Sequence, residues 1–291
     1  VLNELWIVAT TEAAPNPVPL NVKNVLWADW APYEQVIAWT TAEVQAQAPG
    51  WRGQNDLWQA RVTRQNTLAS RREILSPEAG GGYGWWGTRY VWAPNGEALA
   101  YSRPESVGLL TLADRDTTPL LTFPAYRTFS SWSWNPEVTW SPDGLFLATL
   151  THYGEGLEKP EESPVFNLVQ IAAEGDYSAT LAVEVGMWAA PQFSPDGQQL
   201  LYGRAVVPYQ SSTSTYNLYL ADRDGSGQTQ IMAPGATELE LPLWRWRPDG
   251  QGIAFVARGD IHWLPLTPEA EVADSVTALT EDGGVTMLAW R

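Results

Sequence analysis

A short pattern of apolar and polar positions recurs along the 291-residue chain. An aromatic residue ends an apolar stretch, Pro-Asp-Gly or Pro-Asn-Gly follows, and a second apolar stretch then begins. Proline presets φ for a tight turn, and Asn or Asp followed by Gly accepts left-handed backbone angles, so the pattern predicts a two-stranded hairpin. The clear copies are VWAPNGEALAYS (91–102), TWSPDGLFLATL (139–150), QFSPDGQQLLYG (192–203) and RWRPDGQGIAFVA (245–257), and DWAPYEQVIAWT (29–40) is a weaker copy.

Two further segments complete each repeat. A third strand follows the hairpin, as in VFNLVQIAAEG (165–175) and YNLYLADRDGSG (216–227), and a weaker fourth segment such as SATLAVEV (178–185) leads to the next copy. The prolines at 32, 94, 142, 195 and 248 are spaced by 62, 48, 53 and 53 residues. Units of this length with four strands each are the signature of a β-propeller. We therefore predict an all-β, six-bladed β-propeller of four-stranded antiparallel blades.

The repeat also predicts the boundaries of the blades. We place blade 1 at 23–87, blade 2 at 88–134, blade 3 at 135–188, blade 4 at 189–240 and blade 5 at 241–283. NELWIVATTEA (3–13) resembles a third strand with no strand before it, and VTMLAWR (285–291) resembles a first strand with none after it. We expect residues 1–22 to supply the outer strands of an incomplete blade 6 and residues 284–291 its inner strand. Sharing this blade between the two ends removes exposed sheet edges.

Composition narrows the class of protein. Charged residues make up 17% of the chain, below the roughly 25% of ordinary soluble domains, and Trp, Tyr, Pro, Gly and Thr are abundant, as expected for many short strands. The formal net charge is −16, and a field of this sign repels nucleic acid and anionic lipid. No apolar run approaches the length of about 18 residues that spans a membrane. The absence of cysteine excludes disulfides, thiolate metal sites and cysteine nucleophiles.

The repeat resembles that of a known family. The W-S-P-D-G phrase at 140–144 and the segment N-L-Y-L-A-D-R-D-G-S-G at 217–227 resemble the TolB-like, WD40-like (PD40) propeller repeat. Tyr33-Glu34 departs from the Asp-Gly of that repeat. Propellers of this kind include bacterial periplasmic binding proteins, the propeller portion of prolyl-peptidase-like enzymes and some lyases. The resemblance implies a location in the periplasm or at the cell surface. Val1 is not an initiator and no signal peptide is visible, so we expect the export signal to have been removed.

Motifs for catalysis and for cofactors are missing from the sequence. A prolyl-peptidase-like enzyme needs a Gly-x-Ser-x-Gly elbow on an α/β domain, and the chain has neither that motif nor room for that domain. Related propeller lyases bind their metal through several histidines, whereas this chain has only His152 and His262. The acidic run GEGLEKPEESP (154–164) lacks the alternating oxygen ligands of a calcium site. We expect no enzyme activity, no metal and no cofactor.

The loops are the better candidates for a binding site. In propellers, the links from the fourth strand to the next first strand and from the second strand to the third emerge on one face around the channel. Three of the second-to-third loops are long, at 41–55, 151–165 and 205–216, and the fourth-to-first links are rich in aromatic residues. Rigid aromatic rings provide contact area for a sugar or a peptide at little entropic cost. The candidate ligand contacts are Trp51, Trp85, Trp86, Trp132, Trp134, His152, Tyr153, Trp188 and Tyr209.

An alternative role for the tryptophans is packing between blades. We assign the recurrent tryptophans of the repeat to that core, namely Trp30, Trp92, Trp140, Trp246 and Trp290, and leave both roles open for the loop tryptophans. The expected function is a non-catalytic extracytoplasmic binding module that recognises a protein, peptide or glycan at the aromatic loop face. We expect no nucleic-acid partner and no transmembrane segment. The alternatives are the propeller portion of an enzyme, either prolyl-peptidase-like or a glycan lyase, and a structural domain of a larger cell-surface protein.

Overall fold

The computed structural model describes most of the chain as short β-strands. The described residues are 2–8, 16–33, 35–46, 50–77, 87–129, 132–152, 156–231, 239, 243–266 and 276–288. Their contacts divide the chain into two compact units, Val1–Pro119 with Arg127–Asn135 and Leu120–Tyr126 with Pro136–Arg291. Within the described residues, no helix is both long and apolar enough to cross a membrane.

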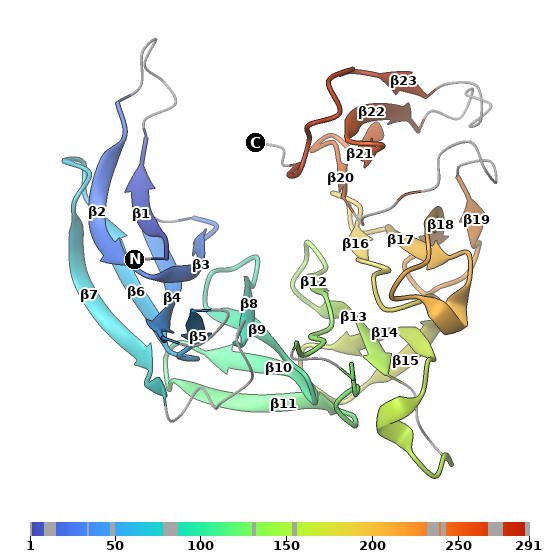
Figure 1. The fold of residues 1–291 in the computed structure, drawn as a ribbon, viewed down its shortest axis with the longest axis horizontal. Coiled ribbons are helices and arrows are strands. Elements are labelled where there is room, and N and C mark those ends of the chain that lie inside the picture. The colour runs from blue at the N-terminus through green and yellow to red at the C-terminus, as the bar shows by residue number, and fades with distance from the viewer. Residues whose placement is uncertain are drawn as a thin grey trace. The chain divides into compact units, whose positions relative to one another are not determined.

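The first unit contains a small sheet and two larger ones (Figure 1). The small sheet pairs β1 (Glu4–Ile7) with β2 (Val18–Lys23). The next has the order β3 (Val25–Trp30), β4 (Val36–Val44), β6 (Leu57–Val62) and β7 (Leu68–Leu75), with β5 (Trp51–Gly53) paired to β4. The third has the order β8 (Arg89–Trp92), β9 (Ala98–Arg103), β10 (Ser106–Thr111) and β11 (Asp116–Thr122). The last three residues of β11 belong to the second unit.

The second unit contains three four-stranded sheets, each in sequence order (Figure 1). They are β12 (Val138–Trp140), β13 (Phe146–His152), β14 (Phe166–Ala172) and β15 (Ser178–Ala182); then β16 (Gln192–Phe193), β17 (Gln199–Ala205), β18 (Tyr216–Asp222) and β19 (Thr229–Gln230); then β20 (Trp244–Trp246), β21 (Gly252–Ala257), β22 (Asp260–Pro265) and β23 (Thr277–Ala278). Every pairing is antiparallel. The prediction of an all-β chain built from four-stranded antiparallel sheets is confirmed.

The Pro-Asp-Gly turns join the first and second strand of their sheets in the same way. In the turn at Pro142, the Gly144 N–H donates to the Ser141 carbonyl (2.9 Å), and the Asp143 carboxylate accepts from the Leu145 N–H (3.0 Å). Gly144 has a φ of 72°, in the left-handed region where a side chain is strained. The glycines of the other three turns, Gly96, Gly197 and Gly250, have φ values of 72°, 70° and 74°. The repeated glycine is therefore required by the turn.

The second strand of the first large sheet is buried on both faces. Ile37 and Trp39 of β4 pack with Val22 of the small sheet, and Leu5 and Ile7 of β1 lie against the same cluster. Ala38, between them in sequence, packs on the other side with a cluster that includes residues of β8, β9 and β10. Successive side chains of a strand point to opposite faces. The sheet is thus covered on both sides, as in the interior of a stack of blades.

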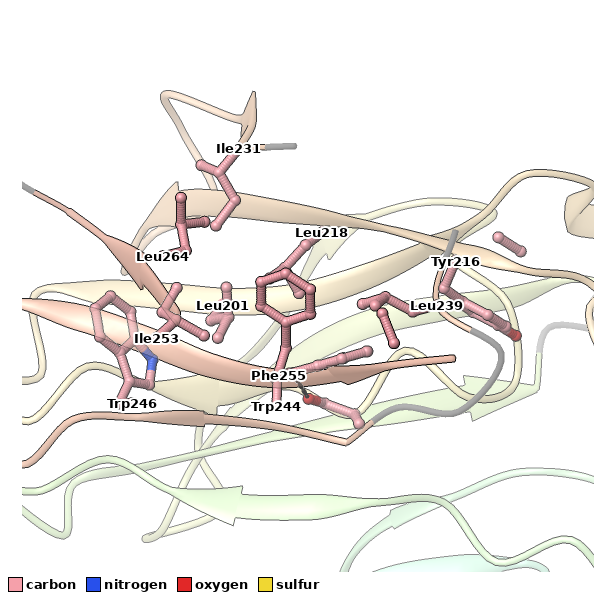
Figure 2. Close-up of a cluster of buried hydrophobic side chains, with 13 residues drawn as sticks. Leu201, Tyr216, Leu218, Ile231, Leu239, Trp244, Trp246, Ile253, Phe255 and Leu264 are labelled. Carbon is pink, nitrogen blue, oxygen red and sulfur yellow. Dashed lines mark hydrogen bonds between the residues drawn. The ribbon is translucent and has the colours of Figure 1, made fainter. Parts of the chain in front are cut away.

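The second unit repeats this arrangement. Ile253 and Phe255 of β21 pack with Leu201 and Leu218 of the neighbouring sheet, and Figure 2 shows these side chains gathered between the two sheets. The opposite face of β21, at Ala254 and Val256, packs against Leu288 near the C-terminus. Residues 284–288 have no strand assignment, and residues 289–291 of the predicted inner strand lie outside the described residues.

The recurrent tryptophans of the repeat are not equally buried. Trp92 and Trp246 are 6% and 8% exposed, Trp140 is half-buried, and Trp290 lies outside the described residues. Trp30 is 37% exposed, so the prediction of a core position is wrong for that residue. Trp30 is the last residue of β3, and Tyr33, three residues later, is itself 78% exposed, so this end of β3 lies at the surface.

Candidate binding pocket at the inner strands

In the first unit, a buried asparagine joins the two kinds of loop that were predicted to share a face. Asn55 precedes β6 in the link from the second to the third strand, and its Oδ1 accepts a hydrogen bond from the Thr88 N–H (2.7 Å). Thr88 follows Gly87 at the end of the link to β8. The Asn135 side chain donates to the Gly87 carbonyl (2.9 Å). Asn55, Thr88 and Asn135 are all buried, so these bonds fix Gly87 and Thr88, immediately before β8.

The second unit has an equivalent arrangement between 183–188 and 206–216. The Ser211 hydroxyl accepts from the Met187 N–H (3.2 Å), and the Tyr216 hydroxyl accepts from the Trp188 N–H (3.1 Å) while donating to the Ser211 carbonyl (2.9 Å). Gly186, with a φ of 94°, lies so close that a Cβ there would be 2.7 Å from the Tyr216 hydroxyl. The link to β16 and the loop before β18 therefore form one rigid assembly.

His152 makes the same kind of connection between links. One ring nitrogen faces the Pro124 carbonyl (3.4 Å) in the link to β12, and the other faces the Ser163 carbonyl in the loop before β14. The ring also packs edge-on against Tyr126, with centroids 5.0 Å apart. Burial lowers the pKa of His152 below its ordinary value. The neutral ring has one N–H, so it donates to one of these two carbonyls while it packs between the two loops, and this histidine holds the loops together.

The candidate ligand contacts fall into different environments. Trp51 and Trp132 are half-buried in the first unit, and Trp134 is 1% exposed there, so its ring belongs to the core and offers no surface to a ligand. In the second unit, Trp188 and Tyr209 lie in the paired loops described above. Tyr209 is 55% exposed and donates to a Glu184 carboxylate oxygen (2.5 Å). Trp85, Trp86 and Tyr153 lie outside the described residues.

A pocket of about 500 Å³ opens where the three inner strands of the second unit begin. Thr139 comes from β12, Gln192 from β16 and Arg245 from β20, and Glu137 lies just before β12. Pro191 and Leu243, each next to the start of an inner strand, add apolar surface. The volume is in the range of small-ligand sites. We refer to this feature as the inner-strand pocket.

The polar groups of the inner-strand pocket are fixed to the strands. The Gln192 side-chain amide donates to the Trp244 carbonyl (2.7 Å), and Arg245 donates to the same carbonyl through Nη1 (2.7 Å). Burial lowers the pKa of Arg245, and the negative charge of Glu137 acts in the opposite direction. An arginine remains protonated under such shifts. The pocket therefore presents a half-buried positive charge in a protein with a net charge of −16.

Sequence reasoning missed the residues of the inner-strand pocket, although a signal was available. Thr139, Gln192 and Arg245 each occupy the position immediately before the aromatic residue of the repeat. Because neighbouring side chains on a strand point to opposite faces, this position faces away from the side on which the aromatic residue packs. The first unit has Asp29 and Val91 at the equivalent positions. Comparison of these five positions predicts the lining of the inner strands without any structure.

Several solved structures have a fold similar to that of this chain. TolB from Agrobacterium tumefaciens is similar over 91% of this chain and 84% of its own, with a TM-score of 0.53 and 14% identity. Dipeptidyl peptidase 4 from Porphyromonas gingivalis has a TM-score of 0.54 and 12% identity over 87% of this chain and 39% of its own. Oligopeptidase B from Leishmania major has a TM-score of 0.53 and 12% identity over 91% of this chain and 34% of its own.

These similarities show a shared fold. The chain has a β-propeller fold similar to that of TolB, as the repeat predicted. It corresponds to little more than a third of each peptidase, and to most of the TolB chain. No protein-family model and no curated protein matches the sequence significantly. Fold similarity at this identity leaves the function to be argued from the pocket itself.

Proposed function

We propose that this chain is a non-catalytic binding module that holds a peptide segment of a partner in the inner-strand pocket. The observation that carries the proposal is the meeting of Thr139, Gln192 and Arg245, from three separate sheets, around one cavity of about 500 Å³. Polar groups that converge from rigid strands next to apolar surface are the usual make-up of a ligand site. Hydrogen-bonding side chains suit a peptide, whose main chain carries a donor and an acceptor at most residues.

The surrounding loops support this proposal. Trp188 lies two residues before Ala190, which also lines the pocket, and its indole N–H donates to the Ser212 carbonyl (3.4 Å). Tyr209 is exposed on the same pair of loops. A partner that enters the inner-strand pocket would meet this aromatic surface outside it. Aromatic side chains on a rigid scaffold contribute strongly to protein interfaces.

The proposal is tested by blocking the pocket. A random peptide library and a glycan array should be screened with the wild-type protein and with Thr139→Phe, which fills the cavity. Leu145→Phe is the matched control, because Leu145 is 59% exposed beyond the turn at the other end of β12. We expect peptides to be retained by the wild type and the control and lost by Thr139→Phe. Retention of glycans alone, or equal binding by all three proteins, would contradict the proposal.

The propeller portion of an enzyme is a second candidate. Two peptidases are similar to this chain at TM-scores of 0.53 and 0.54, close to the 0.53 of TolB. The full coding sequence of the gene, on both sides of these 291 residues, distinguishes a binding module from the propeller portion of an enzyme. A module for binding outside the cytoplasm is expected to follow an export signal, and fractionation of the tagged full-length product should recover it from the periplasm or the cell surface. An encoded hydrolase domain, with activity that requires this propeller, would favour the enzyme.

We further propose that the propeller has six blades, with the sixth shared between the two ends of the chain. β1 and β2 cover one face of β4, and residues 285–288 cover the outer face of β21, so each segment occupies the place of a neighbouring blade within its own unit. A crystal structure of the full-length product tests this count: six sheets, with 4–7 and 285–288 in the same one, would support the proposal. Any other number of sheets, or the two segments in different sheets, would contradict it.

A further inference from the structure

We propose that the inner-strand pocket recognises the free C-terminal carboxylate of a peptide, with Arg245 as its anion-binding residue. This inference rests on the proposed function and adds the chemical group that is bound. Glu137 is a carboxylate whose negative charge acts on the Arg245 guanidinium. Among the described residues, however, no carboxylate forms an ion pair with Arg245 within 4.0 Å.

The hydrogen bonds of Arg245 leave most of its donors available. A guanidinium has five N–H donors, and within the described part of the chain the side chain makes one hydrogen bond, from Nη1 to the Trp244 carbonyl. That bond fixes the orientation of the side chain in the wall of the pocket. A half-buried charge is stabilised when it gains a partner of opposite charge with good hydrogen-bond geometry. A carboxylate is the group that matches the planar guanidinium with two parallel hydrogen bonds.

The other polar side chains of the pocket suit the end of a peptide. Gln192 uses its amide nitrogen on the Trp244 carbonyl, which leaves its Oε1 to accept a peptide N–H. Thr139 adds a hydroxyl that both donates and accepts. Pro191 and Leu243 form apolar surface for a terminal side chain. Apart from the Glu137 carboxylate just before β12, the cavity offers one cation, one acceptor and one hydroxyl, which match a terminal carboxylate and the amide that precedes it.

The net charge of the protein favours a single C-terminal carboxylate over the acidic surface of a partner as the bound group. The chain has a net charge of −16, so a strongly acidic partner is repelled at a distance. A single carboxylate at the end of an otherwise neutral or basic segment avoids that repulsion and reaches the half-buried guanidinium of Arg245. The same reasoning predicts that basic residues upstream of the terminus increase the association rate at low salt.

The experiment compares two libraries of acetylated hexapeptides, one with a free C-terminal carboxylate and one with a C-terminal amide. Each is passed over the immobilised protein, and retained peptides are identified by mass spectrometry and remeasured by calorimetry. We expect free-acid peptides to bind about tenfold or more tightly than their amides, because the amide loses the charged, bidentate contact. Arg245→Gln should abolish the preference, and Arg245→Lys should retain part of it because the charge remains.

Arg247 provides a matched control in the same segment. It lies two residues further along, is 46% exposed and pairs with Asp249 (3.0 Å) outside the pocket. Arg247→Gln should keep the full preference for the free acid. Melting temperatures of all variants show whether the fold is retained, and Arg245→Lys keeps the test valid if Arg245→Gln unfolds.

The outcomes separate this inference from the proposed function. If acid and amide peptides bind equally and both are lost in Thr139→Phe, the pocket binds peptides but the carboxylate inference is overturned. If the preference for the free acid persists in Arg245→Gln, Arg245 is not the anion-binding residue and the inference is likewise overturned. If neither library is retained, both the proposed function and the inference are overturned.

Discussion

Arg223 forms a bidentate ion pair with Asp143, a residue 80 positions earlier in the chain. Its two terminal nitrogens lie 2.6 Å and 3.1 Å from the two carboxylate oxygens. Asp143 belongs to a Pro-Asp-Gly turn, and Arg223 follows β18 in the neighbouring sheet. The guanidinium also lies over the Phe146 ring at 4.7 Å. The turn of one sheet is thereby fastened to the hairpin of the next.

The Arg223–Asp143 pair predicts a specific dependence of stability on acid. Hydrogen bonds from Arg223 hold the pKa of Asp143 at about 2, below its ordinary value of 3.8. The stabilisation is complete above pH 3.8 and is lost as the pH falls from 3.8 toward 2. Arg223→Gln should cost about 1 kcal/mol or less at pH 7, since Asp143 is 39% exposed and water screens the pair.

Urea unfolding between pH 7 and pH 2 measures this effect. The difference between the wild type and Arg223→Gln should shrink as the pH falls through that window. Arg64→Gln, a change at an exposed arginine, should leave the midpoint and its acid dependence as in the wild type. A constant difference between wild type and Arg223→Gln down to pH 2 would exclude the ion pair as the cause.

His152 predicts a second loss of stability at a higher pH. Burial lowers its pKa below 6.5, so the unfolded chain takes up a proton before the folded protein does. The free energy of unfolding should therefore decrease as the pH falls from about 6.5 to the pKa of the folded state. His152→Phe keeps an aromatic ring beside Tyr126 and Phe166. The variant should be less stable than the wild type at pH 7, and its free energy of unfolding should lack this part of the pH dependence. Parallel curves for the two proteins would show that His152 is not responsible.

Gly186 predicts that the rigid loop pair has no space for a methyl group. A Cβ at this position would lie 2.7 Å from the Tyr216 hydroxyl and 2.8 Å from the Ala205 Cβ. Gly186→Ala should cost about 2–3 kcal/mol through the clash and the positive φ together. Gly156 has a φ of 75° with nothing within 4 Å of the same atom, so Gly156→Ala should cost only about 1 kcal/mol. Chemical denaturation of both variants measures the difference, and equal costs would contradict the packing argument.

Trp134 and Tyr209 were expected in one binding surface, and their burial predicts opposite behaviour. Trp134 is 1% exposed, so Trp134→Ala should cost about 3–5 kcal/mol of stability. Tyr209 is 55% exposed, so Tyr209→Ala should change stability by no more than about 0.5 kcal/mol. If Tyr209 contributes to the loop surface, its substitution weakens peptide binding while the melting temperature stays close to that of the wild type. The reverse pattern of melting temperatures would contradict the assignment of Trp134 to the core.

The local elements of this protein are predictable from its sequence. The Pro-Asp-Gly turns depend on residues within one hairpin: Gly144 needs a positive φ, and Asp143 accepts a hydrogen bond from the N–H two residues later. The second strand of each unit follows the turn directly and is apolar at nearly every position. This continuous apolar run predicts a strand that is covered on both faces. Those two features identify four-stranded units of about 50 residues and, with them, the propeller class.

The tertiary structure decided which side chains are available to a ligand. Trp134 and Trp188 both lie in links that lead to a first strand, yet one is buried and the other half-buried. The inner-strand pocket likewise depends on contacts over long separations, such as the hydrogen bond from Gln192 to the Trp244 carbonyl, 52 residues away. Sequence by itself determined the strands, the turns and the repeat, since these arise from short-range backbone preferences. Which residues line a cavity was decided only when separate sheets packed side by side.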